Sequence, residues 1–155
     1  MNKLLLFLMM VGSIAGIAAT TQGSASQAVM ANGVMLKNCK MTVRQESQRP
    51  PGEVSSVDRP RGFAVVFLDL ENKQAIAQPV TIRRLEVQDS LGRVQFVQER
   101  PVEITLGGLE YSSQDFHLQH LGQVQAVGKL RAIVYYQAGG TTGEIMSDFV
   151  ALEMI

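Results

Sequence analysis

The segment "DFHLQH", Asp115 to His120, contains both histidines of the chain and an aspartate two residues before the first. Imidazole and carboxylate groups bind zinc and copper and also carry protons in catalysis. On a strand, His117 and His120 are three residues apart and would point to opposite faces, so they could not share one ion. In a helical turn or loop, both imidazoles could meet, with Asp115 or Cys39 completing a metal site. We expect polar residues at a strand end, and periplasmic copper or zinc binding is the alternative.

No other segment offers a recognisable catalytic arrangement. The sequence has no "GxSxG", "HExxH", "GxGxxG" or P-loop pattern, and a single cysteine cannot form a paired-cysteine motif. Glu103 and Glu110 are spaced as surface residues between apolar neighbours, not as a pair in a cleft. We therefore expect no enzyme and no cofactor, and a hydrolase with an unrecognised site ranks third.

Cys39 is the only cysteine, so no intrachain disulfide can form. The residues before it, Lys37 and Asn38, stand where a lipid-attachment site needs small side chains. We expect a half-buried thiol on the first strand; an intermolecular disulfide or a metal thiolate is the alternative. Stability must then come from the apolar core.

The N-terminus, "MNKLLLFLMMVGSIAGIAATTQGSASQA", has the layout of a secretory signal peptide. Lys3 provides the basic start, an apolar run follows, and a stretch of small polar residues comes next. The run is shorter than the ~20 apolar residues of a typical membrane span. We expect residues 1–28 to be a signal peptide cleaved after Ala25 or Ala28, so that the protein is exported to the periplasm or beyond. Membrane contact is then expected only through this segment.

Length and composition predict one globular domain at residues 29–155. The chain has 155 residues, of which 46% are hydrophobic and 18% charged, which is typical of a folded protein with a sizeable core. Fourteen basic and fourteen acidic residues are scattered along it, leaving no net charge and no basic face. Nucleic-acid binding is therefore disfavoured.

After the N-terminal segment, apolar residues recur at every second position, and turn residues interrupt them about every ten positions. The pattern predicts strands within 33–43, 63–72 and 102–106, and a strand that runs into the histidines. It also predicts two strands joined at "DSLG" within 79–97, and a hairpin over 129–155. A long irregular loop, "RQESQRPPGEVSSVDRPRG", is expected before the strand at 63–72.

Seven or eight short strands without a convincing helix indicate an all-β antiparallel β-sandwich of the immunoglobulin-like or fibronectin-like type. A small barrel is the second choice. The antibody hallmarks of a second cysteine and a tryptophan are absent. The run from "VVFLDLEN" to "PVEITL" resembles the strand-and-turn layout of the N-terminal domain of periplasmic pilus chaperones. That resemblance covers the layout only, and it implies a fold without implying a function.

Two segments favour binding or assembly. The strand "FAVVFLDLEN" has a second apolar face formed by Phe63, Val65 and Phe67, which something must cover. Either the proline-rich segment from Arg49 to Arg61 folds over it, or a partner does. The second segment is an expected C-terminal strand from Ile145 to Ile155, with Phe149 on its less apolar face.

The sequence therefore predicts an exported, non-catalytic binding or assembly module of the cell envelope. Its expected partner is another envelope protein or a second copy of the chain, contacted through Phe63, Val65, Phe67 and Phe149.

Overall fold

The computed structural model describes residues 28–47, 51–52 and 59–155. The expected signal peptide, apart from Ala28, lies outside the described residues, as does most of the segment from Arg49 to Arg61. All assigned elements of the described residues are strands. Accordingly, this part of the chain contains no helix with the length and apolar character to cross a membrane.

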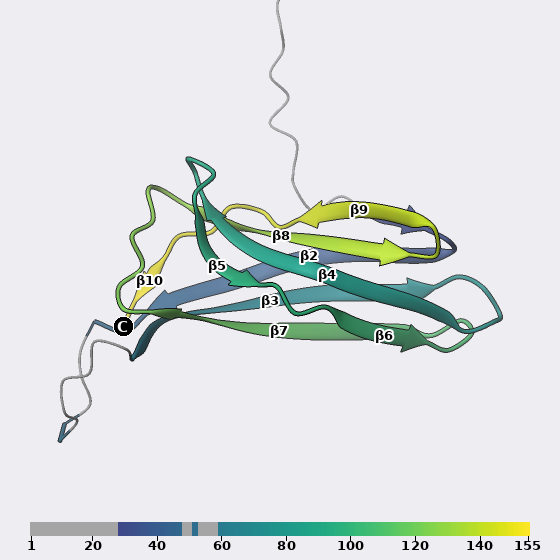
Figure 1. The fold of residues 1–155 in the computed structure, drawn as a ribbon, viewed down its shortest axis with the longest axis horizontal. Coiled ribbons are helices and arrows are strands. Elements are labelled where there is room, and N and C mark those ends of the chain that lie inside the picture. Colours follow the sequence, from purple (N-terminus) through teal and green to yellow (C-terminus); the bar gives the residue numbers. More distant parts are fainter. Residues whose placement is uncertain (1–27, 48–50, 53–58) are drawn as a thin grey trace, which may run out of the picture.

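Within the described residues, ten strands form two sheets that face each other and run along the long axis of the molecule (Figure 1). Sheet A contains β1 (Val29–Ala31), β2 (Val34–Gln45), β3 (Pro60–Asn72), β7 (Tyr111–Leu121) and β10 (Glu153–Met154). Sheet B contains β4 (Gln78–Asp89), β5 (Val94–Gln98), β6 (Val102–Leu106), β8 (Leu130–Ala138) and β9 (Thr141–Met146). The all-β architecture expected from the alternating pattern is confirmed, as two open antiparallel sheets consistent with a β-sandwich.

The order of the strands in each sheet follows from their pairing. Sheet A has the order β1-β2-β3-β7, and β10 pairs with the other end of β2. Sheet B has the order β5-β4-β8-β9, and β6 pairs with β4 beside β5. All these pairings are antiparallel except that of β10 with β2.

The core lies between the two sheets because each long strand turns every second side chain inward. On β3 the inward residues are Ala64, Val66, Leu68 and Leu70, all at most 1% exposed. Sheet B faces them with large apolar side chains, including Ile82, Leu85, Val87, Phe96, Leu106, Leu130 and Val134. The inward stripe predicted for β3 is thus the centre of the core.

A β-bulge in β2 changes which residues face inward. Leu36 and Cys39 are both buried although they are three residues apart. Between them, the register with β3 shifts at Lys37/Lys40, and Asn38 has a φ of 53°. The extra residue restores the alternation, so that Cys39, Met41 and Val43 all point into the core.

Two of the expected turns are present. "DSLG" closes with the amide N–H of Gly92 donating to the carbonyl of Asp89, 2.9 Å away. Gly107 and Gly108 follow β6, and this turn carries the chain from sheet B to sheet A. A Cβ atom on Gly108 would lie 2.0 Å from the carbonyl oxygen of Ala75, so only glycine allows the two loops to approach this closely.

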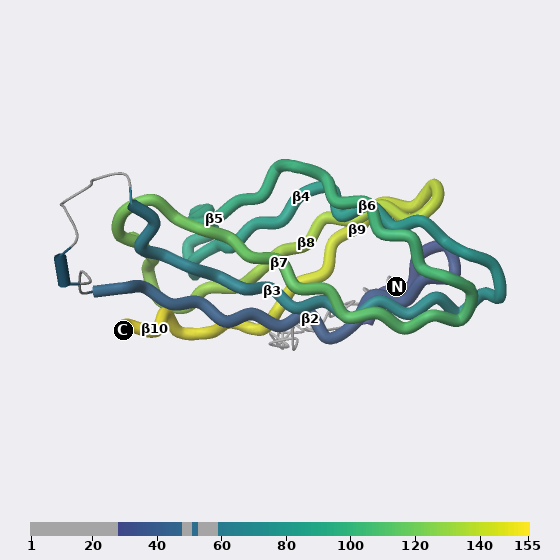
Figure 2. Tube along the Cα trace, turned by 90° about the horizontal axis from the view of Figure 1, so that it is seen from below, coloured from purple at the N-terminus to yellow at the C-terminus, as the bar shows by residue number. Residues whose placement is uncertain are grey.

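The prediction of one strand from Ile145 to Ile155 is wrong. β9 ends at Met146, although Val150 still forms an isolated bridge with Leu130 of β8, and only Glu153 and Met154 pair with β2 in sheet A. The chain end lies beside the end of β2 (Figure 2), and the amide of Ile155 donates to the carbonyl of Gln45 at 3.0 Å. The apolar residues of this segment therefore join the two sheets instead of lining one strand.

Candidate functional site

The outer face of sheet A carries an apolar stripe at its centre. Since β3 lies between β2 and β7, its outward residues Phe63, Val65 and Phe67 occupy the middle of that face. Phe63 and Val65 are half-buried, and Phe67 is 43% exposed. We call these three residues the outer stripe. A polar row is the ordinary covering of a solvated sheet face, so an apolar row there marks a candidate contact surface.

Charged and polar side chains border the outer stripe on both sides. The register places Lys40, Thr42 and Arg44 of β2 opposite Phe67, Val65 and Phe63. On the other side, β7 places Asp115, His117 and Gln119 opposite the same three residues.

The border contacts are specific. The Arg44 guanidinium lies 5.6 Å from the centre of the Phe63 ring, within cation–π range. The imidazole Nε2 of His117 lies 2.7 Å from a carboxylate oxygen of Asp115. The stripe thus has a basic border along β2 and a border of mixed polarity along β7.

The face is hollowed along the stripe. A hollow of about 500 Å³ lies around Phe63 and Val65, bordered by Arg44 and His117. A second hollow of about 310 Å³ lies further along the same strands, around Phe67 and Lys40. Side chains of a partner could therefore enter the face instead of only touching it.

The structure brings together only two of the four candidate metal ligands. His117 projects outward beside Asp115, whereas the ring of His120 packs edge-on against Phe96 at 5.7 Å between centroids. Within the described residues, His120 Nδ1 is buried without a hydrogen-bond partner. β7 is continuous through both histidines, so they lie on opposite faces.

Cys39 lies apart from the histidines in the core. It is 1% exposed, and burial raises the pKa of its thiol to about 12. A protonated thiol is a poor metal ligand and a poor nucleophile. Over the described part of the chain, no three His, Cys, Asp or Glu side chains lie close enough together to hold a metal ion.

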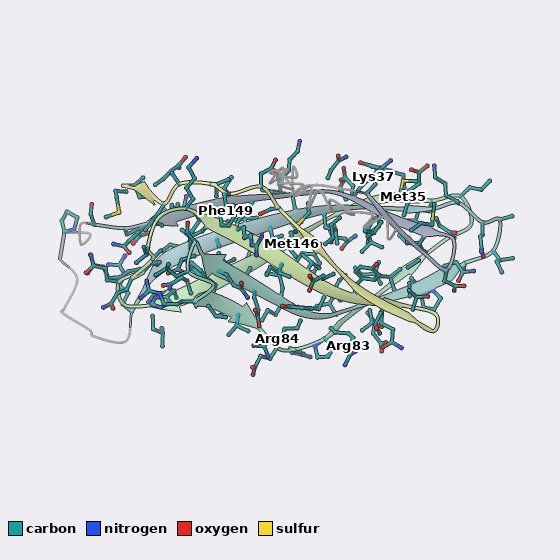
Figure 3. All side chains as sticks on the ribbon, turned by 90° about the horizontal axis from the view of Figure 1, so that it is seen from above. Met35, Lys37, Arg83, Arg84, Met146 and Phe149 are labelled. Carbon is teal, nitrogen blue, oxygen red and sulfur yellow. The ribbon has the colours of Figure 1, made fainter. Side chains whose placement is uncertain are left out.

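Phe149, the fourth residue of the expected contact surface, lies elsewhere. It follows β9, near Met146 (Figure 3), and the guanidinium of Arg131 on β8 lies 5.1 Å from its ring centre. Its exposed fraction is 42%. The structure therefore unites Phe63, Val65 and Phe67 on one face and leaves Phe149 beside sheet B.

The sequence pattern gave no indication of a hollow of about 600 Å³ on the outer side of sheet B. Arg83, Arg84 and Tyr135 line it, and both arginines project outward (Figure 3) because the register with β8 shifts between Ile82 and Arg84. Arg84 already pairs with Glu86 and Glu99, at 2.6 and 3.2 Å. In the sequence, the signal for this register shift is the pair of adjacent arginines between the apolar residues Ile82 and Leu85.

Comparison with known proteins adds no family to these observations. No protein-family model matches the chain, and a search of curated proteins finds no match.

Proposed function

We propose that the chain is an exported, non-catalytic binding or assembly module with an immunoglobulin-like sandwich, and that it contacts another envelope protein through the outer stripe. The observation that carries the proposal is the exposure of Phe67 at the centre of a sheet face, in line with Phe63 and Val65. Aromatic side chains surrounded by a polar border are typical of the centre of protein interfaces.

The strand order supports the immunoglobulin-like part of the proposal. In the constant-type form of that fold, the first, second, fifth and fourth strands form one sheet, and the third, sixth and seventh face them. Here β2, β3 and β7 lie side by side, opposite β4, β8 and β9. The chain order therefore agrees for six strands, whereas β5 and β6 take the fourth place and pair with β4 instead of β7.

The start of the sandwich supports export. Its first strand, β1, begins at Val29, directly after the proposed cleavage at Ala28 and shortly after the one at Ala25. Removal of the N-terminal segment at either position would leave every strand of the sandwich intact. A single buried cysteine is also compatible with an oxidising compartment.

The borders of the outer stripe indicate the chemistry of the partner. An apolar ridge would fit the hollow around Phe63 and Val65, and acidic groups on it would meet Lys40 and Arg44 of β2. Polar groups on its other side would meet Asp115 and Gln119 of β7. Such mixed charge around an apolar centre favours a protein surface over a small apolar ligand.

The proposal is tested by photo-cross-linking in the cells that make the protein. A photoreactive phenylalanine analogue in place of Phe67 is expected to cross-link to one defined envelope protein. The same analogue in place of Ile76, which is 66% exposed in the loop after β3, serves as the control and is expected not to. Equal labelling from both positions, or none from Phe67, would overturn the proposal.

Binding of that partner should then depend on the outer stripe. Phe67→Lys is expected to weaken binding at least tenfold, while the free energy of unfolding changes by only about 0.5 kcal/mol because the side chain is on the surface. Ile76→Lys is the matched variant and should bind normally. If Phe67→Lys unfolds the protein, the residue belongs to the core and the interface assignment is wrong.

A further inference from the structure

The free edge of β7 is a second unexplained surface. β7 is an outer strand of sheet A and pairs with β3 on one side; among the described residues, no strand pairs with its other side. It is 11 residues long, and its register with β3 is regular from Gly62 to Glu71. A row of backbone N–H and C=O groups on such an edge can pair with another strand.

The other sheet edges carry features that prevent such pairing. β1 and β10 have only three and two residues, and β9 has six. β5 and β6 are separated by Glu99, Arg100 and Pro101. The stretch of β2 between β1 and β10 has lysines at its start and a bulge at Asn38.

By contrast, β7 has none of these protections. Its sequence, "YSSQDFHLQHL", contains no lysine, arginine, proline or glycine. Edge strands that must stay unpaired usually have such residues or bulges. The long regular edge of β7 is therefore the exception in this molecule.

We propose that β7 pairs with β7 of a second copy of the chain, antiparallel, around a two-fold axis at Phe116. In this register, Asp115 of each copy lies opposite His117 of the other. Tyr111 lies opposite Leu121, which pairs two exposed apolar residues at each end of the interface. The strand is thus complementary to itself in both charge and polarity.

Neighbouring registers lose this complementarity. A shift of the axis to Asp115 would place the two Asp115 carboxylates opposite each other, and a shift to His117 would place the two imidazoles opposite each other. A register that pairs odd with even residues would turn the buried Phe116 and Leu118 outward on one copy. Only the register around Phe116 sets Asp115 of each copy opposite His117 of the other.

The dimer would make one continuous sheet from the two copies of sheet A. Two copies of β7 would lie between the two copies of β3, so the outer stripes would be about 14 Å apart on the same face. The proposed dimer leaves Phe63, Val65 and Phe67 uncovered but uses Asp115 and His117, which border the outer stripe. Phe67→Lys therefore tests partner binding, and variants of Asp115 and His117 test the dimer.

The first test is the mass of the purified exported protein in solution, by analytical ultracentrifugation at about 100 µM. A dimer is expected. A monomer at that concentration would overturn the proposal.

The second test uses charge exchange across the two-fold axis. His117→Glu places a glutamate opposite Asp115 twice, and Asp115→Lys places a lysine opposite His117 twice. Each variant alone is expected to dimerise at least tenfold more weakly. A mixture of the two should restore a heterodimer, because the introduced lysine of one copy then meets the introduced glutamate of the other, and the unchanged His117 meets the unchanged Asp115.

Control variants test whether dimerisation depends on this edge in particular. Thr141→Glu, on the exposed edge of β9, is the matched charge change and should leave dimerisation unchanged. Both β7 positions are exposed on the outer face, so the circular dichroism spectra of the variants should be unchanged. A dimer that tolerates both single variants, or a mixture that stays monomeric, would show that another surface is used.

Discussion

At the scale of single residues, Asp89 shows how one buried carboxylate can organise three segments. Its side chain has no exposed surface and accepts hydrogen bonds from the backbone amides of Leu91, Arg93 and Val127, at 2.9 to 3.1 Å. The Arg93 guanidinium donates to it at 2.8 Å. Burial alone would raise the pKa of Asp89, but these bonds outweigh burial and lower it to about 2.

The lowered pKa predicts an acid-dependent loss of stability. The ordinary pKa of an aspartate is 3.8, so the unfolded chain binds a proton at a higher pH than the folded one. The contribution of Asp89 is therefore complete above about pH 4 and lost as the pH falls through about 2. Asp89→Asn should be less stable at pH 7 and lose less stability over this pH range, as measured by urea unfolding.

Other carboxylates also lose stabilising contacts in acid, so the parent protein must be compared with Asp89→Asn at each pH. The pKa of Glu71 is lowered by its hydrogen bond and ion pair with Lys37, so the parent and the variant both lose that contribution in acid. The difference between the two unfolding curves isolates Asp89. Parallel curves from pH 7 to 2 would contradict the assigned role.

The sequence predicted the outer stripe but not its surroundings. Alternation along "FAVVFLDLEN" identifies which residues leave the core, because the period of a strand is fixed. It does not reveal that Lys40 and Asp115 flank Phe67, since that depends on pairing with strands far away in the chain. Phe149 was expected at the contact surface as part of a C-terminal strand from Ile145 to Ile155, but that strand ends at Met146, and Phe149 lies against Arg131 of sheet B.

At the scale of elements, the bulge in β2 depends on one backbone conformation. Asn38 has a φ of 53°, a left-handed region that asparagine and glycine adopt readily and β-branched residues do not. Its side chain also donates to Asp69 at 2.7 Å on the exposed outer face. The bulge keeps both Leu36 and Cys39 in the core.

Substitutions at Asn38 should therefore separate backbone from side-chain effects. Asn38→Gly should be tolerated, whereas Asn38→Val should lower the free energy of unfolding by about 1–2 kcal/mol, because a β-branched side chain is strained in the left-handed region. Lys40→Val, on the exposed face of the same strand, is the control and should be nearly neutral. Equal destabilisation by glycine and valine would assign the effect to the bond with Asp69 instead.

Most strands could be predicted from their pattern, but the way they change sheets could not. The segments around Ala64, Val80 and Val134 lie in strands as expected, although only the one around Ala64 alternates without interruption. The error at the C-terminus arose because Met146, Val150, Leu152 and Met154 keep an even spacing across a change of sheet. Ser147 marks the real end of β9: its hydroxyl accepts from the amide of Ala132 and donates to the carbonyl of Asp148.

At the scale of the whole molecule, the proposed export makes a direct prediction about the mature N-terminus. Intact mass of the exported protein is expected to correspond to a chain beginning at Ser26 or Val29. A protein that retains Met1 and sediments with membranes would contradict cleavage. In either result, the sandwich beginning at Val29 remains complete.

The positions of β1 and β10 on β2 have a mechanical consequence. β1 pairs with Val34–Leu36, and β10 pairs in parallel with Arg44 and Gln45 at the opposite end of a strand about 40 Å long. A force pulling Val29 and Ile155 apart would therefore act along β2. It would load the hydrogen bonds of β2 with β3 and β10 in shear. These bonds would then have to break at the same time, not one after another. We expect such an arrangement to resist tension better than one in which the bonds break in turn.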